Sequence, residues 1–436
     1  MLDINLIRNN KEVILDDLKK RGNKNLVKIL DEITELDKHH NALKKQLDDL
    51  KHKRNNSSKQ ISELIKLKKT TEAEKLKNEL KNLSKTIAQK DKEKLEQSQK
   101  LRQLMLRLPN ILHKSVPMGK DDSNNLEIRN WGDKKKYDFP VLNHIEIGRY
   151  HDLFDIERAA KVSGARFYYL KNEAVKLEFA LIQFALDFLK KKGFTLTTTP
   201  MLIKEEILEG AGFLPSGADE VYKIEGENKY LVGTSEQALC GYYANETMIA
   251  KDLPIKMCGY SSCFRTEAGS HGKDTKGIFR VHQFEKIEMF IFCHPEKSWE
   301  EHEKLINIAE EMNQLLEIPY RVVNICTGDI GVVASKKYDL EGWFPSQKTY
   351  RELVSCGNCT DYQARRTNIK YRNEEGTAPA GFVHTLNSTA IAIQRTLSAI
   401  IENHQQKDKS IKIPKVLHKY FGADKIEKEN YKRVCR

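Results

Sequence analysis

The sequence predicts a chain in two parts: a long pair of antiparallel α helices, followed by a mixed α+β domain of about 300 residues. Three observations lead to this prediction. No glycine or proline occurs between Asn23 and Leu108, and these two residue types interrupt helices most strongly. A polar, turn-rich stretch follows Pro109. Beyond that stretch, strand-like and helix-like segments alternate. We expect boundaries at residues 1–108, 109–170 and 171–436.

Within residues 1–108, apolar positions have the spacing of a coiled coil. They recur alternately four and three residues apart, in the series Ile29, Ile33, Leu36, His40, Leu43, Leu47 and Leu50. A second series contains Leu76, Leu80, Leu83 and Ile87. The polar stretch 66–74 separates the two series and predicts a turn. Folded back on itself, the segment would form an arm of roughly 60 Å.

The charge of the chain is concentrated in this arm. The whole chain carries a formal net charge of +12. Between residues 41 and 105 there are 18 basic and 9 acidic residues. The pattern alone leaves two interpretations open: a spacing or dimerising coiled coil whose lysines only solvate it, or a rod that lies along a nucleic-acid backbone.

Several classes of protein are excluded or disfavoured. The most apolar stretch, 174–189, contains Lys176, Glu178 and Asp187, so no membrane-spanning helix is expected. The N-terminus lacks the pattern of a signal or transit peptide, and the eight cysteines show no disulfide spacing. We therefore expect a cytoplasmic protein. Neither a Rossmann nor a Walker phosphate loop occurs.

The second part of the chain alternates helices and strands. Residues 171–192 and 298–316 have helical periodicity, whereas 194–198 and 285–293 are typical of strands. Arg265 and Glu267 stand two apart before a loop over 268–276; on a strand they would share one face, either as a phosphate and amine site or as a surface ion pair. In 384–397 a strand would run into a helix carrying Arg395, with Asn387 to Thr389 as capping side chains. Such a cap is also an anion site.

These segments resemble three signatures of class II aminoacyl-tRNA synthetases. The stretch Gly193–Pro200 resembles the first signature, Phe264-Arg-Thr-Glu with its loop the second, and the segment ending at Arg395 the third. Within that class the chain resembles the seryl-tRNA synthetase family. The specific strings begin at Gly233 (Gly-Thr-Ser-Glu), Phe279, Tyr338 and Glu352, and they occur in order over the whole chain.

The resemblance implies an antiparallel sheet flanked by helices, a homodimer, and a two-step reaction. Serine would react with ATP to give seryl-adenylate and pyrophosphate, and the seryl group would then pass to the 3′ end of serine tRNA. Whether selenocysteine tRNA is also charged with serine, as is common in the family, stays open. In this family the arm holds the long variable arm of serine tRNA, which favours the RNA-binding interpretation of the lysines. Lys273 and Lys276 would face the acceptor stem.

The resemblance also assigns residues. Arg265 would hold the α-phosphate of ATP and Arg395 the γ-phosphate, and both would be catalytic. Further ATP contacts are expected from Thr266, Glu267, Phe279, Val281, Glu352, Leu353, Val354 and Ser355. Phe279 would stack on adenine. Magnesium would bridge the phosphates with help from Glu352 and Ser355. Serine would be bound by Thr234, Ser235, Glu236, Glu288 and Thr389. The division of ammonium and hydroxyl between Glu236 and Glu288 stays open.

Two alternatives remain beside this interpretation. The weaker is a different class II synthetase, which the N-terminal helical hairpin and the string Thr234-Ser-Glu236 disfavour. The other is a protein without catalysis. A non-catalytic paralogue would keep the fold and the arm but is expected to have lost Arg265, Glu288, Glu352 or Arg395, all of which are present.

Cys356 and Cys359 form a Cys-x-x-Cys pair, but no second pair exists, which disfavours a zinc site. His282 is expected to pack rather than act as a base, because the serine carboxylate is itself the nucleophile.

Overall fold

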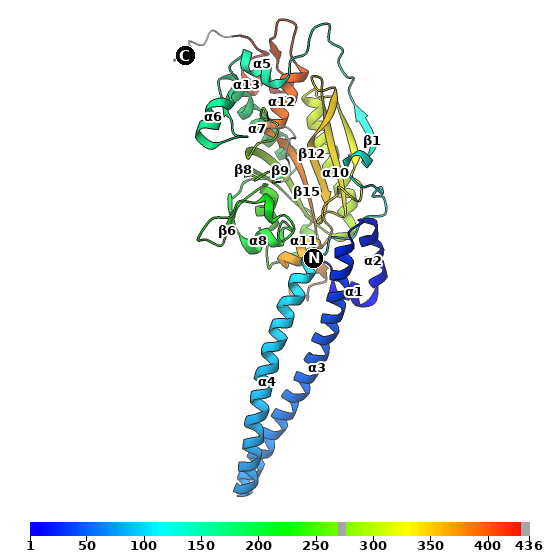
Figure 1. The fold of residues 1–436 in the computed structure, drawn as a ribbon, viewed down its shortest axis with the longest axis vertical. Coiled ribbons are helices and arrows are strands. Elements are labelled where there is room, and N and C mark those ends of the chain that lie inside the picture. The colour runs from blue at the N-terminus through cyan, green and yellow to red at the C-terminus, as the bar shows by residue number, and fades with distance from the viewer. Residues whose placement is uncertain (269–275, 429–436) are drawn as a thin grey trace. The chain divides into compact units, whose positions relative to one another are not determined.

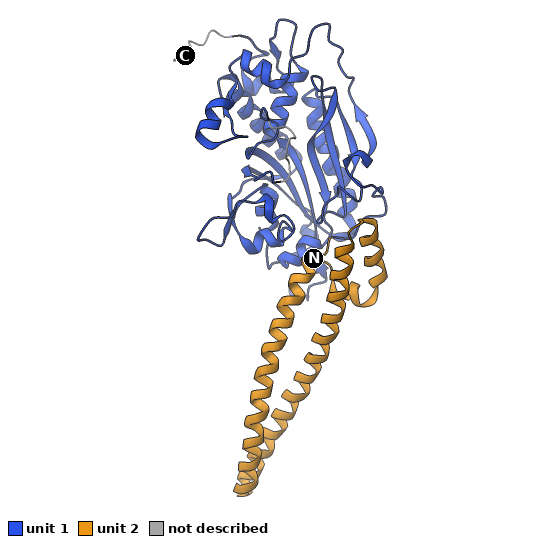
Figure 2. Cartoon of the chain, in the orientation of Figure 1, with its two compact units in different colours: residues 1, 110–436 blue, residues 2–109 orange. Residues whose placement is uncertain are grey.

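The computed structural model describes residues 1–268 and 276–428. It divides into two compact units (Figure 2). Residues 2–109 form the first, here named the helical arm, and residue 1 together with 110–436 form the second, here named the main unit.

The helical arm consists of α1 (Ile4–Asn9), α2 (Lys11–Lys20), α3 (Lys24–Lys66) and α4 (Thr70–Met105). The long helices α3 and α4 run antiparallel, since Lys51 pairs with Asp91 at 2.8 Å and Lys90 donates to Gln46 at 2.9 Å. The turn between them occupies 67–69, inside the stretch where the sequence predicted it.

The two predicted apolar series meet in this arm. Leu43, Leu47 and Ile87 are buried against one another, with Leu50 and Leu83 packed beside them. The a/d spacing therefore forms the seam of a helical hairpin, as the periodicity predicted.

The main unit is built on an eight-stranded sheet within its described residues (Figure 1). In spatial order the strands are β1 (Leu126–Trp131), β10 (Tyr320–Asn324), β11 (Lys336–Phe344), β12 (Thr349–Asn358), β15 (His384–Ala392), β9 (Gln283–Cys293), β8 (Ile255–Phe264) and β4 (Thr195–Thr198). All adjacent pairs are antiparallel except β4 and β8 at one edge. The predicted antiparallel sheet is confirmed, with this one parallel pair.

The central strand β9 shows how the sheet separates core from site. Ile287, Met289 and Ile291 lie in the main hydrophobic cluster with residues of α7 (Glu173–Lys191), α10 (Ser298–Leu315) and α12 (Ile393–Asn403). The alternate residues Lys286 and Glu288 line a pocket instead. Side chains alternate across a strand. One set of side chains on β9 therefore packs against the helices that cover one face of the sheet, and the other set lines the pocket on the opposite face.

Shorter elements complete the main unit. The helices are α5 (His144–Tyr150), α6 (Ile156–Ser163), α8 (Glu205–Gly210), α9 (Ser235–Cys240), α11 (Tyr362–Thr367) and α13 (His418–Phe421). Small sheets are formed by β2 (Phe154–Asp155) with β3 (Tyr169–Leu170), by β5 (Leu202–Lys204) with β6 (Lys229–Leu231), and by β16 (Ile411–Lys412) with β17 (Lys425–Ile426). A three-stranded sheet joins β14 (Gly381–Phe382), β13 (Lys370–Arg372) and β7 (Thr247–Ile249).

The helices and strands expected over 171–192, 194–198, 285–293 and 298–316 are all present, with ends displaced by at most two residues. Two local expectations were wrong. Asn387 to Thr389 do not cap a helix but lie inside β15, which continues to Ala392 before α12 begins. Arg265 and Glu267 do not share a strand, because β8 ends at Phe264 and Glu267 has a positive φ of 53°.

Candidate active site

A pocket opens on the face of the sheet that α7, α10 and α12 do not cover. Most of the residues singled out from the sequence meet there. These are Thr234, Glu236, Arg265, Glu267, Phe279, Val281, Glu288, Glu352, Leu353, Ser355, Thr389 and Arg395.

Three of the singled-out side chains are engaged elsewhere. Ser235 is fully buried and donates from its hydroxyl to the carbonyl of Gly259 at 2.9 Å. A Cβ on Gly259 would lie 2.9 Å from the Ser235 hydroxyl oxygen, so the glycine allows α9 to approach β8 closely. Thr266 donates from its hydroxyl to the carbonyl of Asp219. Val354 is buried in the main hydrophobic cluster.

The guanidinium of Arg265 is fixed from several sides. Its Nε donates to the carbonyl of Gly233 at 3.2 Å, and its guanidinium carbon lies 5.3 Å from the ring centre of Phe284. His282 holds the backbone of Arg265 in place: the Arg265 N–H donates to the His282 carbonyl at 2.9 Å, and the His282 Nδ1 lies 3.0 Å from the Arg265 carbonyl. These contacts agree with the packing role predicted for His282.

Phe279 forms an aromatic wall of the pocket. Its ring lies edge-on to Phe344, with 5.3 Å between the ring centres. The guanidinium carbons of Arg351 and Arg395 lie 4.5 Å and 4.9 Å from the ring centre, within the range of cation–π attraction. Arg351 was not singled out from the sequence, and it reaches the ring from β12.

A polar cluster surrounds Glu352, and Arg395 links it to the Phe279 ring. Arg395 donates from Nη1 to the Glu352 carbonyl at 3.0 Å and pairs with its carboxylate at 3.2 Å. The Glu352 side chain is 46% exposed, and despite partial desolvation the charges of Arg395 and Lys337 hold its pKa below the usual value. Burial raises the pKa of the adjacent Asp339 to about 7, and Asp339 pairs across the strands with Ser355.

Two acidic side chains lie deeper, in contrasting surroundings. Glu288 is 2% exposed; its carboxylate pairs with Lys286 Nζ at 2.6 Å and accepts from the Thr389 hydroxyl at 3.4 Å. The Glu236 carboxylate accepts from two neutral amides, Gln363 at 2.9 Å and Asn387 at 3.0 Å. Burial, followed by the nearby Glu288 carboxylate, raises the pKa of Glu236 to about 7.

Sequence reasoning missed several residues of the pocket. Lys286 and Phe284 lie on the same face of β9 as Glu288, so strand alternation could have identified them. Lys337, Asn387, Gln394 and Arg280 also line the pocket. Asn387 had been interpreted as a helix cap. Lys276 is exposed beside the loop, whereas Lys273 lies outside the described residues.

No group of three or more histidine, cysteine or acidic side chains is arranged to hold a metal within residues 1–268 and 276–428. Cys356 and Cys359 are free and fully buried, and burial raises the pKa of both thiols. No helix in those same ranges is both long and apolar enough to cross a bilayer.

The comparisons with known proteins match both units. Residues 1–112 match the model of the seryl-tRNA synthetase N-terminal domain. Residues 221–404 match the model of the class II tRNA synthetase core domain of the glycine, histidine, proline, serine and threonine enzymes.

The similarity also covers whole chains. A serine–tRNA ligase of Pyrococcus abyssi is 48% identical over 100% of this chain and 99% of its own. The crystal structure of seryl-tRNA synthetase from Pyrococcus horikoshii complexed with ATP has a TM-score of 0.93 and 46% identity, covering 99% of this chain and 100% of its own. That of the cytoplasmic enzyme from Naegleria fowleri with AMP has a TM-score of 0.86 and 38% identity, covering 99% of each chain. The chain therefore belongs to the seryl-tRNA synthetase family of class II aminoacyl-tRNA synthetases.

Proposed function

We propose that this chain activates serine with ATP, releasing pyrophosphate, and then transfers the seryl group to the 3′ end of serine tRNA. The observation that carries the proposal is the composition of one pocket. Arg265 and Arg395 supply cations suited to phosphates, and Glu236, Glu288 and Thr389 supply acceptors suited to an ammonium and a hydroxyl. Relatives of this chain have been crystallised with ATP and with AMP, which supports a nucleotide in this pocket.

The adenine is proposed to stack on Phe279, with Glu267 and the backbone of Val281 at its edge. The guanidinium carbon of Arg395 lies 4.9 Å from the centre of the same ring. Arg395 is proposed to reach the γ-phosphate from this side of the pocket.

Activation needs two negatively charged groups to meet: the serine carboxylate and the α-phosphate. Attack by a carboxylate oxygen on phosphorus breaks the bond to pyrophosphate. Fixed cations stabilise the charge that develops in such a displacement, and a fixed geometry removes much of the entropic barrier. Arg265 is proposed to do both at the α-phosphate, which its contacts with Gly233, Phe284 and His282 support.

Magnesium is proposed to join the phosphates with help from the Glu352 carboxylate and the Ser355 hydroxyl. Oxygen ligands of this kind suit Mg²⁺, which commonly takes one or two protein carboxylates and completes its shell with phosphate oxygens and water. Both residues line the pocket on β12. The ion would neutralise phosphate charge, while Lys337 adds a cation from β11.

The surroundings of Glu236 and Glu288 support different roles for these two residues in serine binding. Glu288 already has a cation in Lys286 and lies beside the Thr389 hydroxyl, which suits the serine hydroxyl. Glu236 is held by two neutral amides, so its negative charge is available to the serine ammonium. Thr234 lines the same end of the pocket. The binding role stays a prediction for Ser235, Thr266 and Val354, because their side chains contact other groups in the fold.

The helical arm is proposed to hold serine tRNA by its backbone. Exposed lysines lie along both long helices, at Lys44, Lys45, Lys53, Lys59, Lys75, Lys77, Lys81, Lys85, Lys92 and Lys100. Such a rod neutralises phosphates without reading bases. Lys276 is proposed to meet the acceptor stem. Charging of selenocysteine tRNA with serine is a separate proposal, tested by supplying that tRNA in a charging assay.

A homodimer is proposed from the apolar side chains left on the surface of the main unit. Phe179 of α7 is 63% exposed, Leu196 of β4 is 39% exposed, and Leu202 of β5 is 47% exposed. Large apolar side chains exposed on an edge strand, here Leu196 of β4, and on the helix packed against it, here Phe179 of α7, are typical of an interface. The edge strand β4 belongs to the segment that resembles the dimer-forming first signature.

The proposal is tested by ATP–pyrophosphate exchange with serine, threonine, alanine and glycine supplied separately, using Arg265→Ala as the blank. Exchange that depends on serine alone is expected. No exchange with any amino acid, from a folded protein, would favour the non-catalytic paralogue, an RNA-binding protein without activation.

A further inference from the structure

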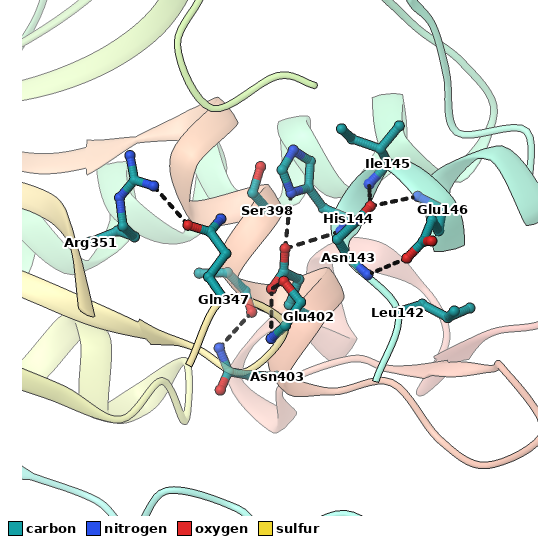
Figure 3. Close-up of polar contacts among 12 residues, drawn as sticks. Leu142, Asn143, His144, Ile145, Glu146, Gln347, Arg351, Ser398, Glu402 and Asn403 are labelled. Atoms are coloured by element: carbon teal, nitrogen blue, oxygen red, sulfur yellow. Dashed lines mark hydrogen bonds and ion pairs between the residues drawn. The ribbon is translucent and has the colours of Figure 1, made fainter. Parts of the chain in front are cut away.

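A buried polar cluster beside the pocket has no role in the assignments above. Its centre is Glu402 on α12, whose side chain is fully buried (Figure 3). Oxygen Oε1 accepts from the backbone N–H of His144 at 3.0 Å and lies 2.9 Å from His144 Nδ1. Oxygen Oε2 accepts from the hydroxyl of Ser346 at 2.6 Å and from its backbone N–H at 3.4 Å.

The environment of Glu402 selects a carboxylate. Two backbone N–H groups and one hydroxyl point at it, and the imidazole of His144 can present Nδ1–H as a further donor. Glutamine offers one accepting oxygen and an NH₂ group. In this cluster that NH₂ group must face a backbone donor on one side, at either His144 or Ser346.

Of the three elements joined by this carboxylate, α12 and the β11–β12 segment contact the Phe279 ring, and α5 contacts the backbone two residues before it. On α12, Arg395 precedes Glu402 by seven residues, two helical turns, so both lie on one side of the helix. Ser346 lies between β11 and β12, two residues after Phe344 and five before Arg351, and these two side chains contact the Phe279 ring. Arg351 is held in turn by Gln347, which accepts from its Nη1 at 2.7 Å.

The third element is α5, which begins at His144 and supports the end of the loop before Phe279. A Cβ on Gly277 would lie 2.2 Å from His144 Nε2, and Gly277 has a positive φ of 83°. The backbone at Gly277 therefore rests directly on the imidazole ring. Ile278, the next residue, is fully buried in the main cluster, so the chain that leads into Phe279 is held by His144 at Gly277 and by the core at Ile278.

We infer that Glu402 and His144 are positioning residues for the nucleotide: the carboxylate locks α12, α5 and the β11–β12 turn together, and so sets the geometry of Phe279, Arg351 and Arg395. Neither Glu402 nor His144 lines the pocket. The inference rests on the proposed binding of ATP in this pocket. Loosening the lock weakens ATP binding and leaves the serine end, built on β9, β15 and α9, unchanged.

The test is Glu402→Gln, with the KM values for ATP and for serine measured separately by pyrophosphate exchange and the Kd for ATP measured by calorimetry without serine. We expect the KM and Kd for ATP to rise roughly tenfold, the scale of one hydrogen bond to a charged group. The KM for serine is expected to stay within about twofold.

Two further variants keep the test decisive. Ser346→Ala removes only the 2.6 Å hydroxyl contact, should raise the KM for ATP in the same direction to a smaller extent, and decides the matter if Glu402→Gln does not fold. Glu310→Gln is the matched control. Glu310 is also a buried carboxylate, but it pairs with Arg129 at the β1 edge of the sheet, and its loss should change neither KM.

Equal changes in both KM values, or no change in ATP binding for Glu402→Gln and Ser346→Ala, would reduce Glu402 to a purely structural residue and overturn the inference. A wild-type protein that binds ATP but shows no serine-dependent exchange would instead contradict the proposed function. In that case the calorimetric ATP affinities of the same variants still decide the positioning role.

Discussion

We expect serine binding by the wild-type protein to depend on pH, and we expect Glu236→Gln to remove that dependence. Burial and the Glu288 carboxylate raise the pKa of Glu236 to about 7. Below that pH the side chain is protonated and cannot attract the serine ammonium. As pH falls from 8 to 6, the ionised fraction falls from about 91% to about 9%. The value of kcat/KM for serine should therefore fall about tenfold across this range.

Glutamine keeps the size of the side chain and an oxygen that can accept from Gln363 or Asn387, but has no charge to titrate. At pH 8 we expect Glu236→Gln to lower kcat/KM for serine roughly tenfold to a hundredfold, the range for losing a hydrogen bond to a charged group. Between pH 6 and 8 its kcat/KM should be nearly flat. The assay is pyrophosphate exchange at saturating ATP, with serine varied at each pH.

Other charges near Glu236 define the controls. Glu288, Lys286 and Arg265 all influence it electrostatically, and burial also raises the pKa of Asp339 to about 7. If the pH step survives in Glu236→Gln, the titrating group is another one, and Asp339 is the first to test. A wild-type profile without any step between pH 6 and 8 would refute the reasoning from burial.

Three further predictions follow from the site, the arm and the surface. Arg265→Ala should lower serine-dependent exchange by two or more orders of magnitude, and a change below about tenfold, or 1.4 kcal/mol, removes it from the α-phosphate. Replacing residues 51–91 with a short turn should preserve exchange but greatly lower tRNA charging, whereas equal loss of both steps would contradict a separate arm function. Phe179→Glu should shift the protein to a monomer in sedimentation analysis, and an unchanged mass would place the interface elsewhere.

Much of the fold could be predicted because its signals are local. The arm followed from an unbroken helical composition and a repeat of four and three, which needs no knowledge of distant residues. Strand β9 was visible as an apolar run over 285–293. The parallel edge pair β4–β8 left no such signal, because strand direction depends on the path of the chain between the strands.

The site was predictable only where a family resemblance named its residues. Glu236 meets Gln363 and Asn387 across separations of 127 and 151 positions, and no periodicity relates them. Asn387 looked like a helix cap because asparagine favours caps, yet the strand continues for five more residues to Ala392. Glu402 and His144 are 258 positions apart, so their pairing is visible only in three dimensions.

Because the arm is a helical hairpin, its length can change through matched insertions in α3 and α4. Facing positions in α3 and α4 have residue numbers that add to a nearly constant value, as Lys51 with Asp91 and Gln46 with Lys90 show. An insertion in one helix must therefore be matched in the other, and a matched pair of seven-residue insertions extends the seam by about 10 Å without changing its register. The length of the arm can therefore change in steps of whole heptads, and with it the proposed reach along serine tRNA, while the pocket of the main unit stays the same.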